Sequence, residues 1–155
     1  MISSTPIPPR EGIGFYVWNL SHYLTALGHQ VQIITRGQMG RMSKKVVDGI
    51  TIWQPPFWPL YPFHVHVHGL FVDKLVQTLA NEVDLFHLHT PLVKWPASKK
   101  PALVTVHTPM KADTGSIPLT SGLGWLIKLQ APFSYRLEQQ LFDNANKLTS
   151  VAHSV

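Results

Sequence analysis

The clearest periodic pattern in the chain is a helical one that begins at a pair of glycines. Apolar residues recur at three- and four-residue steps from Ile13 to Leu27, and Gly28 follows where a C-terminal helix cap belongs. This spacing predicts an amphipathic helix that opens at Gly12-Ile13-Gly14. Three prolines lie between residues 5 and 11, which predicts a loop there, because proline fixes φ and lacks a backbone donor.

Short apolar runs alternate with further helical patterns along the rest of the chain. Strands are predicted at 1–4, 31–35, 50–53, 84–88, 102–107 and 147–152, and helices at 63–80 and 121–143. The aperiodic segments 36–45 and 109–120 are predicted loops. Because strands alternate with helices, the pattern predicts an α/β fold, a Rossmann-like parallel sheet with helices on both faces. The 155 residues fit a single domain, 1–155.

Composition and charge narrow the classes of partner. The formal net charge is +5, which favours anionic partners, but the basic residues are scattered, so nucleic-acid binding is not expected. Only 14% of residues are charged, and a charge-poor surface with many aromatics suits contact with another domain or a membrane. The chain lacks cysteine and any apolar run long enough to span a bilayer, which favours a cytoplasmic protein, with peripheral contact at the inner membrane as an extension.

Three segments are expected to meet at the carboxyl ends of the strands, where parallel α/β sheets bind ligands. The first is Gly12-Ile13-Gly14, whose helix N-terminus can attract phosphate, although these glycines can equally serve only to shape a turn. The second is His87 and His89, which strand alternation places on one side; His87 is interpreted as hydrogen-bonded within the fold and His89 as the better ligand contact. The third is His107, which ends an apolar strand, with Lys111 as a nearby cation for phosphate or hydroxyl groups.

Two other chemistries are weighed and disfavoured. A dinucleotide fingerprint needs a third glycine, but Val17 stands there, and Arg36 rather than an acidic residue follows the second strand. His64, His66 and His68 would share a face on a strand, as metal ligands do, but the surrounding pattern is helical. We therefore expect neither a bound metal nor another cofactor.

Aromatic residues lie beside cations near the predicted C-terminal helix, in residues 124–129 and at Phe133, Tyr135 and Arg136. Such a face can lie in a bilayer interface. The alternative is that these side chains pack on the sheet or on another domain.

Four ordered motifs together resemble the N-terminal domain of GT-B-fold glycosyltransferases of family four. Pro8-Pro9 through Gly14, with the helix as far as Gly28-His29-Gln30-Val31, resembles the family's proline loop, glycine loop and strand entry. The other three motifs are Val47-Asp48-Gly49-Ile50, Asp84-Leu85-Phe86-His87-Leu88-His89 and Val104-Thr105-Val106-His107-Thr108.

The resemblance implies an enzyme that transfers a sugar from a nucleotide-sugar donor to a sugar or lipid-linked acceptor, usually with retention and without a bound metal. This domain would hold the acceptor, and a C-terminal nucleotide-sugar-binding domain, absent from these residues, would complete the enzyme. Gly12, Ile13 and Gly14 would approach the donor phosphates, and His107 would be catalytic, with Thr108 and Lys111 beside it.

One departure from the family pattern is Glu11, which stands where the loop usually has its first glycine. The alternative function is a non-catalytic domain that binds a sugar phosphate or a partner protein.

Overall fold

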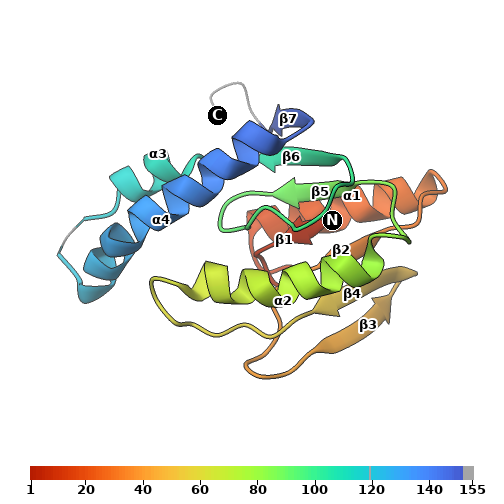
Figure 1. Cartoon of the computed structure of the whole chain (residues 1–155), viewed down its shortest axis with the longest axis horizontal. Coiled ribbons are helices and arrows are strands. Elements are labelled where there is room, and N and C mark those ends of the chain that lie inside the picture. Colours follow the sequence, from red (N-terminus) through yellow and green to blue (C-terminus); the bar gives the residue numbers. More distant parts are fainter. Residues whose placement is uncertain (119, 152–155) are drawn as a thin grey trace.

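The computed structural model describes residues 1–118 and 120–151, which form one twisted sheet with helices packed on it (Figure 1). The seven strands are ordered β3-β4-β2-β1-β5-β6-β7, and all neighbours are parallel except β3 and β4. The predicted α/β class and largely parallel sheet are therefore confirmed. The strands are β1 (Ile2–Ser3), β2 (Gln32–Ile34), β3 (Ser43–Val47), β4 (Ile50–Gln54), β5 (Phe86–His89), β6 (Ala102–Val106) and β7 (Lys147–Ser150). The helices are α1 (Gly12–Ala26), α2 (His64–Leu79), α3 (Met110–Gly115) and α4 (Gly122–Asn144).

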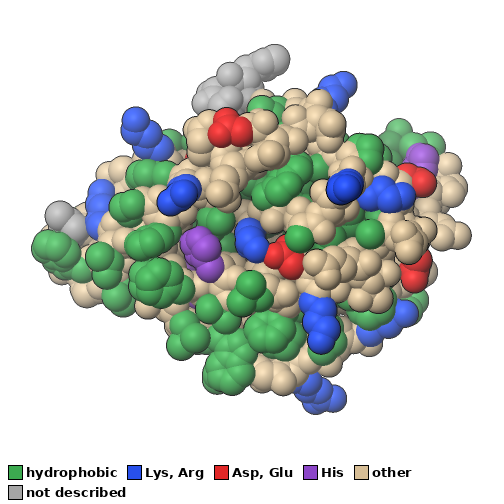
Figure 2. All heavy atoms as spheres, in the orientation of Figure 1, with side chains coloured by type: hydrophobic (Ala, Val, Ile, Leu, Met, Phe, Trp, Pro, Cys, Tyr) green, Lys and Arg blue, Asp and Glu red, His purple; other side chains and the backbone are tan. Residues whose placement is uncertain are grey.

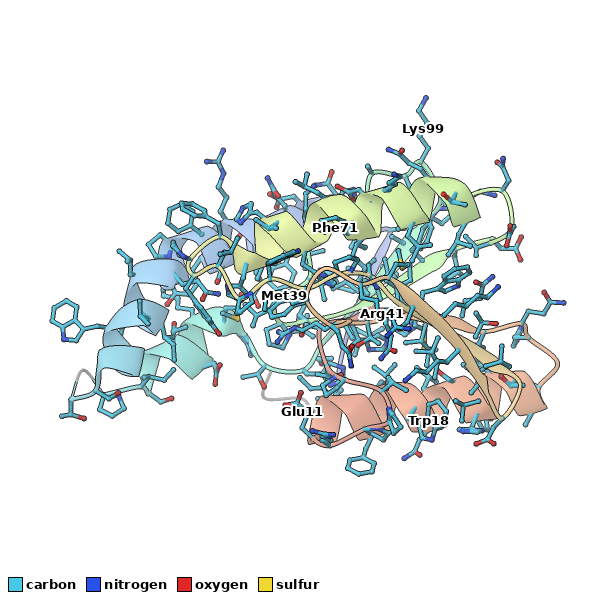
Figure 3. All side chains as sticks on the ribbon, turned by 90° about the horizontal axis from the view of Figure 1, so that it is seen from below. Glu11, Trp18, Met39, Arg41, Phe71 and Lys99 are labelled. Carbon is cyan, nitrogen blue, oxygen red and sulfur yellow. The ribbon has the colours of Figure 1, made fainter. Side chains whose placement is uncertain are left out.

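The helices cover both faces of the sheet, as predicted. On one face, Val17 of α1 packs into a cluster with Ile33, Ile50 and Ile52. On the other face, α2 and α4 pack against the alternate residues of β1, β5 and β6 in a larger cluster. Figure 3 shows α1 and α2 on opposite sides of the sheet. The two clusters follow from the alternation of side chains along each strand.

The predicted loop at 36–45 was wrong at residues 43–45, which belong to the edge strand β3. Asp48 and Gly49 both have positive φ, 50° and 78°, and join β3 to β4 as a two-residue hairpin turn. Lys44 and Lys45 lie on this exposed edge, so the strand carries no apolar alternation. The Asp-Gly pair was the local signal for a hairpin.

The predicted loop at 109–120 was also wrong in part, because it contains α3. Thr114 of this short helix donates to the Met110 carbonyl oxygen at 2.8 Å and also shares a hydrogen bond with the Tyr135 hydroxyl. The apolar face predicted for α1 is only partly buried, since Tyr23 and Leu27 are exposed. The predicted last strand ends at Ser150 within the described residues, and residue 152 lies outside them.

Candidate functional site

The glycine loop sits where the proline-rich segment folds back over the start of α1. Gly14 is buried, and a Cβ there would lie 3.2 Å from the Pro9 Cβ and 3.4 Å from the Pro6 carbonyl oxygen. Gly12 is exposed, with no neighbouring atom within 4 Å of a Cβ position. Packing thus explains the glycine at 14, whereas the amide end of α1 at Gly12 is open to solvent. Ile13, between them, packs at the edge of the smaller apolar cluster.

His87 is held inside the sheet by a short polar chain. Its Nε2 lies 2.7 Å from the Thr105 hydroxyl, which lies 2.8 Å from the Thr149 hydroxyl on the next strand. Burial lowers the pKa of His87 to about 4, so the ring is neutral near pH 7. The structure agrees with the interpretation of His87 as a hydrogen-bonded residue of the fold.

His89 and His107 come together at the carboxyl ends of β5 and β6. The Nδ1 of His89 lies 3.2 Å from the Nε2 of His107, so one of these nitrogens donates to the other. Burial lowers the pKa of both rings, most strongly that of His89, which is fully buried. Two buried polar atoms beside this pair, His89 Nε2 and Thr90 Oγ1, have no hydrogen-bond partner. The pair is therefore neutral near pH 7, with hydrogen-bonding capacity left over.

Tyr16 links the start of α1 to both histidines. Its ring meets the His107 ring edge-on at 4.9 Å between centroids and the His89 ring at 5.8 Å. Because Tyr16 lies one helical turn after Gly12, the first turn of α1 is next to the histidine pair. The sequence assigned Tyr16 to the apolar face of the helix. Its polar neighbours could be found only once the register of α1 over the sheet was known.

Thr108 and Lys111, the two other predicted site residues, follow His107 but are exposed. Within the described ranges, no hydrogen bond or ion pair joins either side chain to the histidines. The segment between β6 and α3, which carries both residues, is held by Glu138 of α4. The Glu138 carboxylate accepts a hydrogen bond from the Met110 amide at 3.0 Å. Burial raises the pKa of Glu138, and the hydrogen bond from Met110 opposes that rise. Sequence reasoning missed Glu138 because this contact links residues 28 positions apart.

The three histidines at the start of α2 are arranged by the helix, not by a strand. His64 and His68 are buried, and His68 Nδ1 donates to the Pro56 carbonyl oxygen at 2.8 Å. Among the residues the structure describes, no group of three His, Cys, Asp or Glu side chains is placed to hold a metal ion. None of the helices within residues 1–118 and 120–151 has the length and apolar character of a membrane span.

A pocket of about 550 Å³ lies at the opposite, amino edge of the sheet. It is lined by Gln30 and Gln32 beside β2, and by Asp84 and Phe86 beside β5. Neither His89 nor His107 lines this pocket, although His87 does, and its ring centroid lies 4.1 Å from that of His89.

The family described as Glycosyltransferase Family 4 matches residues 10–155 of the chain. A search of curated proteins gives no match.

Proposed function

Because the chain belongs to glycosyltransferase family 4, we propose that it is the acceptor-side half of an enzyme that transfers a sugar from a nucleotide-sugar donor to an acceptor. The observation that carries this proposal is the neutral His89–His107 pair beside the first turn of α1. Ligands of parallel α/β sheets bind at this edge. The position of the pair at this edge supports the proposal.

His107 is proposed as the catalytic side chain of this half. A neutral imidazole can accept a hydrogen bond from a sugar hydroxyl at only one of its nitrogens. In the proposed arrangement the Nε2–H of His107 donates to the Nδ1 of His89, which leaves the Nδ1 of His107 as the acceptor. His107 is partly exposed and His89 is buried, so His107 is the one that faces a ligand. His89 then serves mainly to orient it, and Thr108 and Lys111 follow on the exposed side.

The donor phosphates are proposed to approach Gly12, Ile13 and Gly14. The open amides and the dipole of α1 favour negative charge at this end. Glu11 adjoins the same helix end, and its side chain makes no capping hydrogen bond. Because its negative charge repels a bound diphosphate, this loop is expected to bind anions more weakly than one with glycine at position 11.

A second domain is proposed to hold the nucleotide, so that transfer, with retention, takes place in the cleft between the two. Positioning can supply about 7–11 kcal/mol of a reaction barrier, and the isolated chain lacks the nucleotide grip that would provide it. We therefore predict that these 155 residues fold but do not catalyse transfer.

The test is a transfer assay on the purified chain with a panel of UDP- and GDP-sugars, together with calorimetry. The expected result is no turnover and no nucleotide-sugar binding in the micromolar range. Multiple turnovers by the isolated chain, or micromolar binding of a nucleotide sugar, would show that this half holds the donor instead. A non-catalytic domain that binds a sugar phosphate would pass this test, and the His107 variant described in the Discussion separates the two functions.

A further inference from the structure

Arg36 carries a positive charge that the fold leaves without an anionic partner. It follows β2 directly after the buried Thr35, and it is itself half-buried. Its guanidinium carbon lies 4.7 Å from the centre of the Phe57 ring. Within the described ranges, no hydrogen bond or ion pair joins its side chain to another residue.

Arg36 lies beside an aromatic ring and close to histidines whose pKa burial lowers. The Phe57 ring that it covers also meets the rings of His64 and His68 edge-on, at 5.8 and 5.5 Å. His68 uses its Nδ1 on the Pro56 carbonyl oxygen, and the buried His64 Nδ1 has no partner. A partly desolvated guanidinium among aromatic rings and neutral histidines is costly unless an anion reaches it.

Among the residues that the structure describes, Glu11 is the carboxylate whose charge acts on Arg36. Burial lowers the pKa of Arg36, while the nearby Tyr61 and Glu11 raise it. Glu11 is exposed at the start of α1 and forms no ion pair with Arg36 within 4 Å. The two side chains thus influence each other through space but leave the donors of the guanidinium free.

Arg36 also lies at the edge of the sheet that carries the histidine pair. From β2 the strand order runs to β1, β5 and β6, so Arg36 and His107 are three strand spacings apart, roughly 14 Å. Figure 3 places Glu11, at the start of α1, at the same end of the sheet as Met39 in the loop that follows Arg36. One ligand at this edge can therefore reach both Arg36 and His107.

We propose that Arg36 binds a carboxylate or phosphate group carried by the acceptor, and hence that the acceptor is an acidic sugar or a sugar phosphate. The planar fork of the guanidinium matches two oxygens of either group, and the Phe57 ring beneath it fixes its plane. The identification of this ligand as the acceptor rests on the proposed function, whereas anion binding at Arg36 does not depend on transfer.

The experiment is an NMR titration of the labelled 155-residue chain with glucose 6-phosphate, glucuronate, neutral glucose and UDP. Either acidic sugar is expected to shift the Arg36 side-chain signal, and neutral glucose is not. Arg36→Gln should weaken binding of the acidic sugar by at least about tenfold, the size expected for a charge-assisted hydrogen bond. Arg36→Lys, which keeps the charge and loses the fork, should fall between the two.

Two further variants sharpen the result. Arg41→Gln removes an exposed arginine from the loop after Arg36 and should leave binding unchanged. Glu11→Gln should tighten binding, because it removes a negative charge that acts on Arg36. The backbone spectrum of each variant reports whether it keeps the fold.

The inference is overturned if neither acidic sugar shifts the Arg36 signal, or if Arg36→Gln and Arg41→Gln bind alike. It is also overturned if only UDP depends on Arg36, since the group would then belong to the donor. None of these readouts involves transfer, so a failure here leaves the role of His107 untouched, and a failure of His107 leaves the anion site standing.

Discussion

The buried histidines make the fold less stable at acidic pH. Burial lowers the pKa of His64 and of His87 to about 4, from 6.5 in an unfolded chain. The unfolded state therefore binds more protons between these values, and each residue's contribution to stability is complete above about pH 6.5 and is lost as the pH falls toward 4. The buried amine of Met1, whose pKa is lowered to about 5, adds a dependence of the same sign beginning near pH 8.

His64→Phe isolates one part of this dependence. The substitution removes a buried nitrogen without a partner and leaves a ring among Phe57 and Tyr61. We expect the free energy of unfolding to rise by about 1 kcal/mol at pH 7.5, and by roughly 2 kcal/mol more at pH 4.5. Urea unfolding at both pH values measures the difference. An equal effect at the two pH values would mean that His64 titrates normally in the folded chain.

Helix α4 covers the sheet and also supports the segment that follows β6. Its Glu138 holds the Met110 amide, three residues after His107, so the helix supports the junction that carries the proposed site. The carboxylate receives this amide on both oxygens, at 3.0 and 3.2 Å. Glu138 of α4 thus fixes the segment that follows β6.

Glu138→Ala should therefore destabilise the fold by about 1–3 kcal/mol, because it leaves a buried amide without an acceptor. Glu138→Gln, which keeps one acceptor oxygen, should cost less. Gln140→Ala, at an exposed position of the same helix, is the matched control and should change stability by less than about 0.5 kcal/mol. Denaturant unfolding gives all three values, and equal losses in Glu138→Ala and Gln140→Ala would exclude a supporting role for the carboxylate.

The secondary-structure elements differ in how well they could be predicted from the sequence. The parallel sheet was predictable because buried strands and amphipathic α1 and α2 leave periodic patterns. β3 was missed because an exposed edge strand needs no apolar alternation. α3 was missed because this short helix is held by hydrogen bonds to distant residues, from Thr114 to Tyr135 and from Met110 to Glu138. The histidines were predictable as polar residues at the ends of apolar strands. The contacts of Tyr16 and Arg36 were not, because they depend on how helices and loops lie over the sheet.

At the scale of the whole molecule, one exposed apolar face stands out. Trp125 and Leu129 of α4 are 64% and 60% exposed, so they do not pack on this chain's own sheet. Phe63, just before α2, meets Phe133 of α4 at 5.3 Å between ring centroids. Figure 2 shows hydrophobic side chains gathered over this half of α4 and over the segment that leads into α2. The face is thus built from two parts of the chain, only one of which was predicted.

We propose that this face contacts an anionic membrane surface, with the net charge of +5 adding attraction. The chain should float with vesicles that contain phosphatidylglycerol at low salt, and Trp125→Ala combined with Leu129→Ala should abolish most of that binding. Replacing Tyr23 of α1 and Leu27, which follows α1 as its C-cap, by Ala is the matched control, because both are exposed. If the chain does not float with vesicles at low salt, the membrane proposal is wrong. The exposed apolar side chains would then be explained by packing against a second domain.

Transfer is proposed to take place at the His89–His107 pair. It is tested by the effect of His107→Ala on transfer by a protein that contains this chain together with the proposed nucleotide-sugar-binding domain, with His22→Ala on α1 as the control. The predicted result is a loss of at least about 100-fold in kcat for His107→Ala, the scale of a positioned hydrogen-bonding group in the transition state, with little change for His22→Ala and an intact fold in both. Near-normal transfer by a folded His107→Ala protein would contradict the claim and favour a domain that only binds a sugar phosphate.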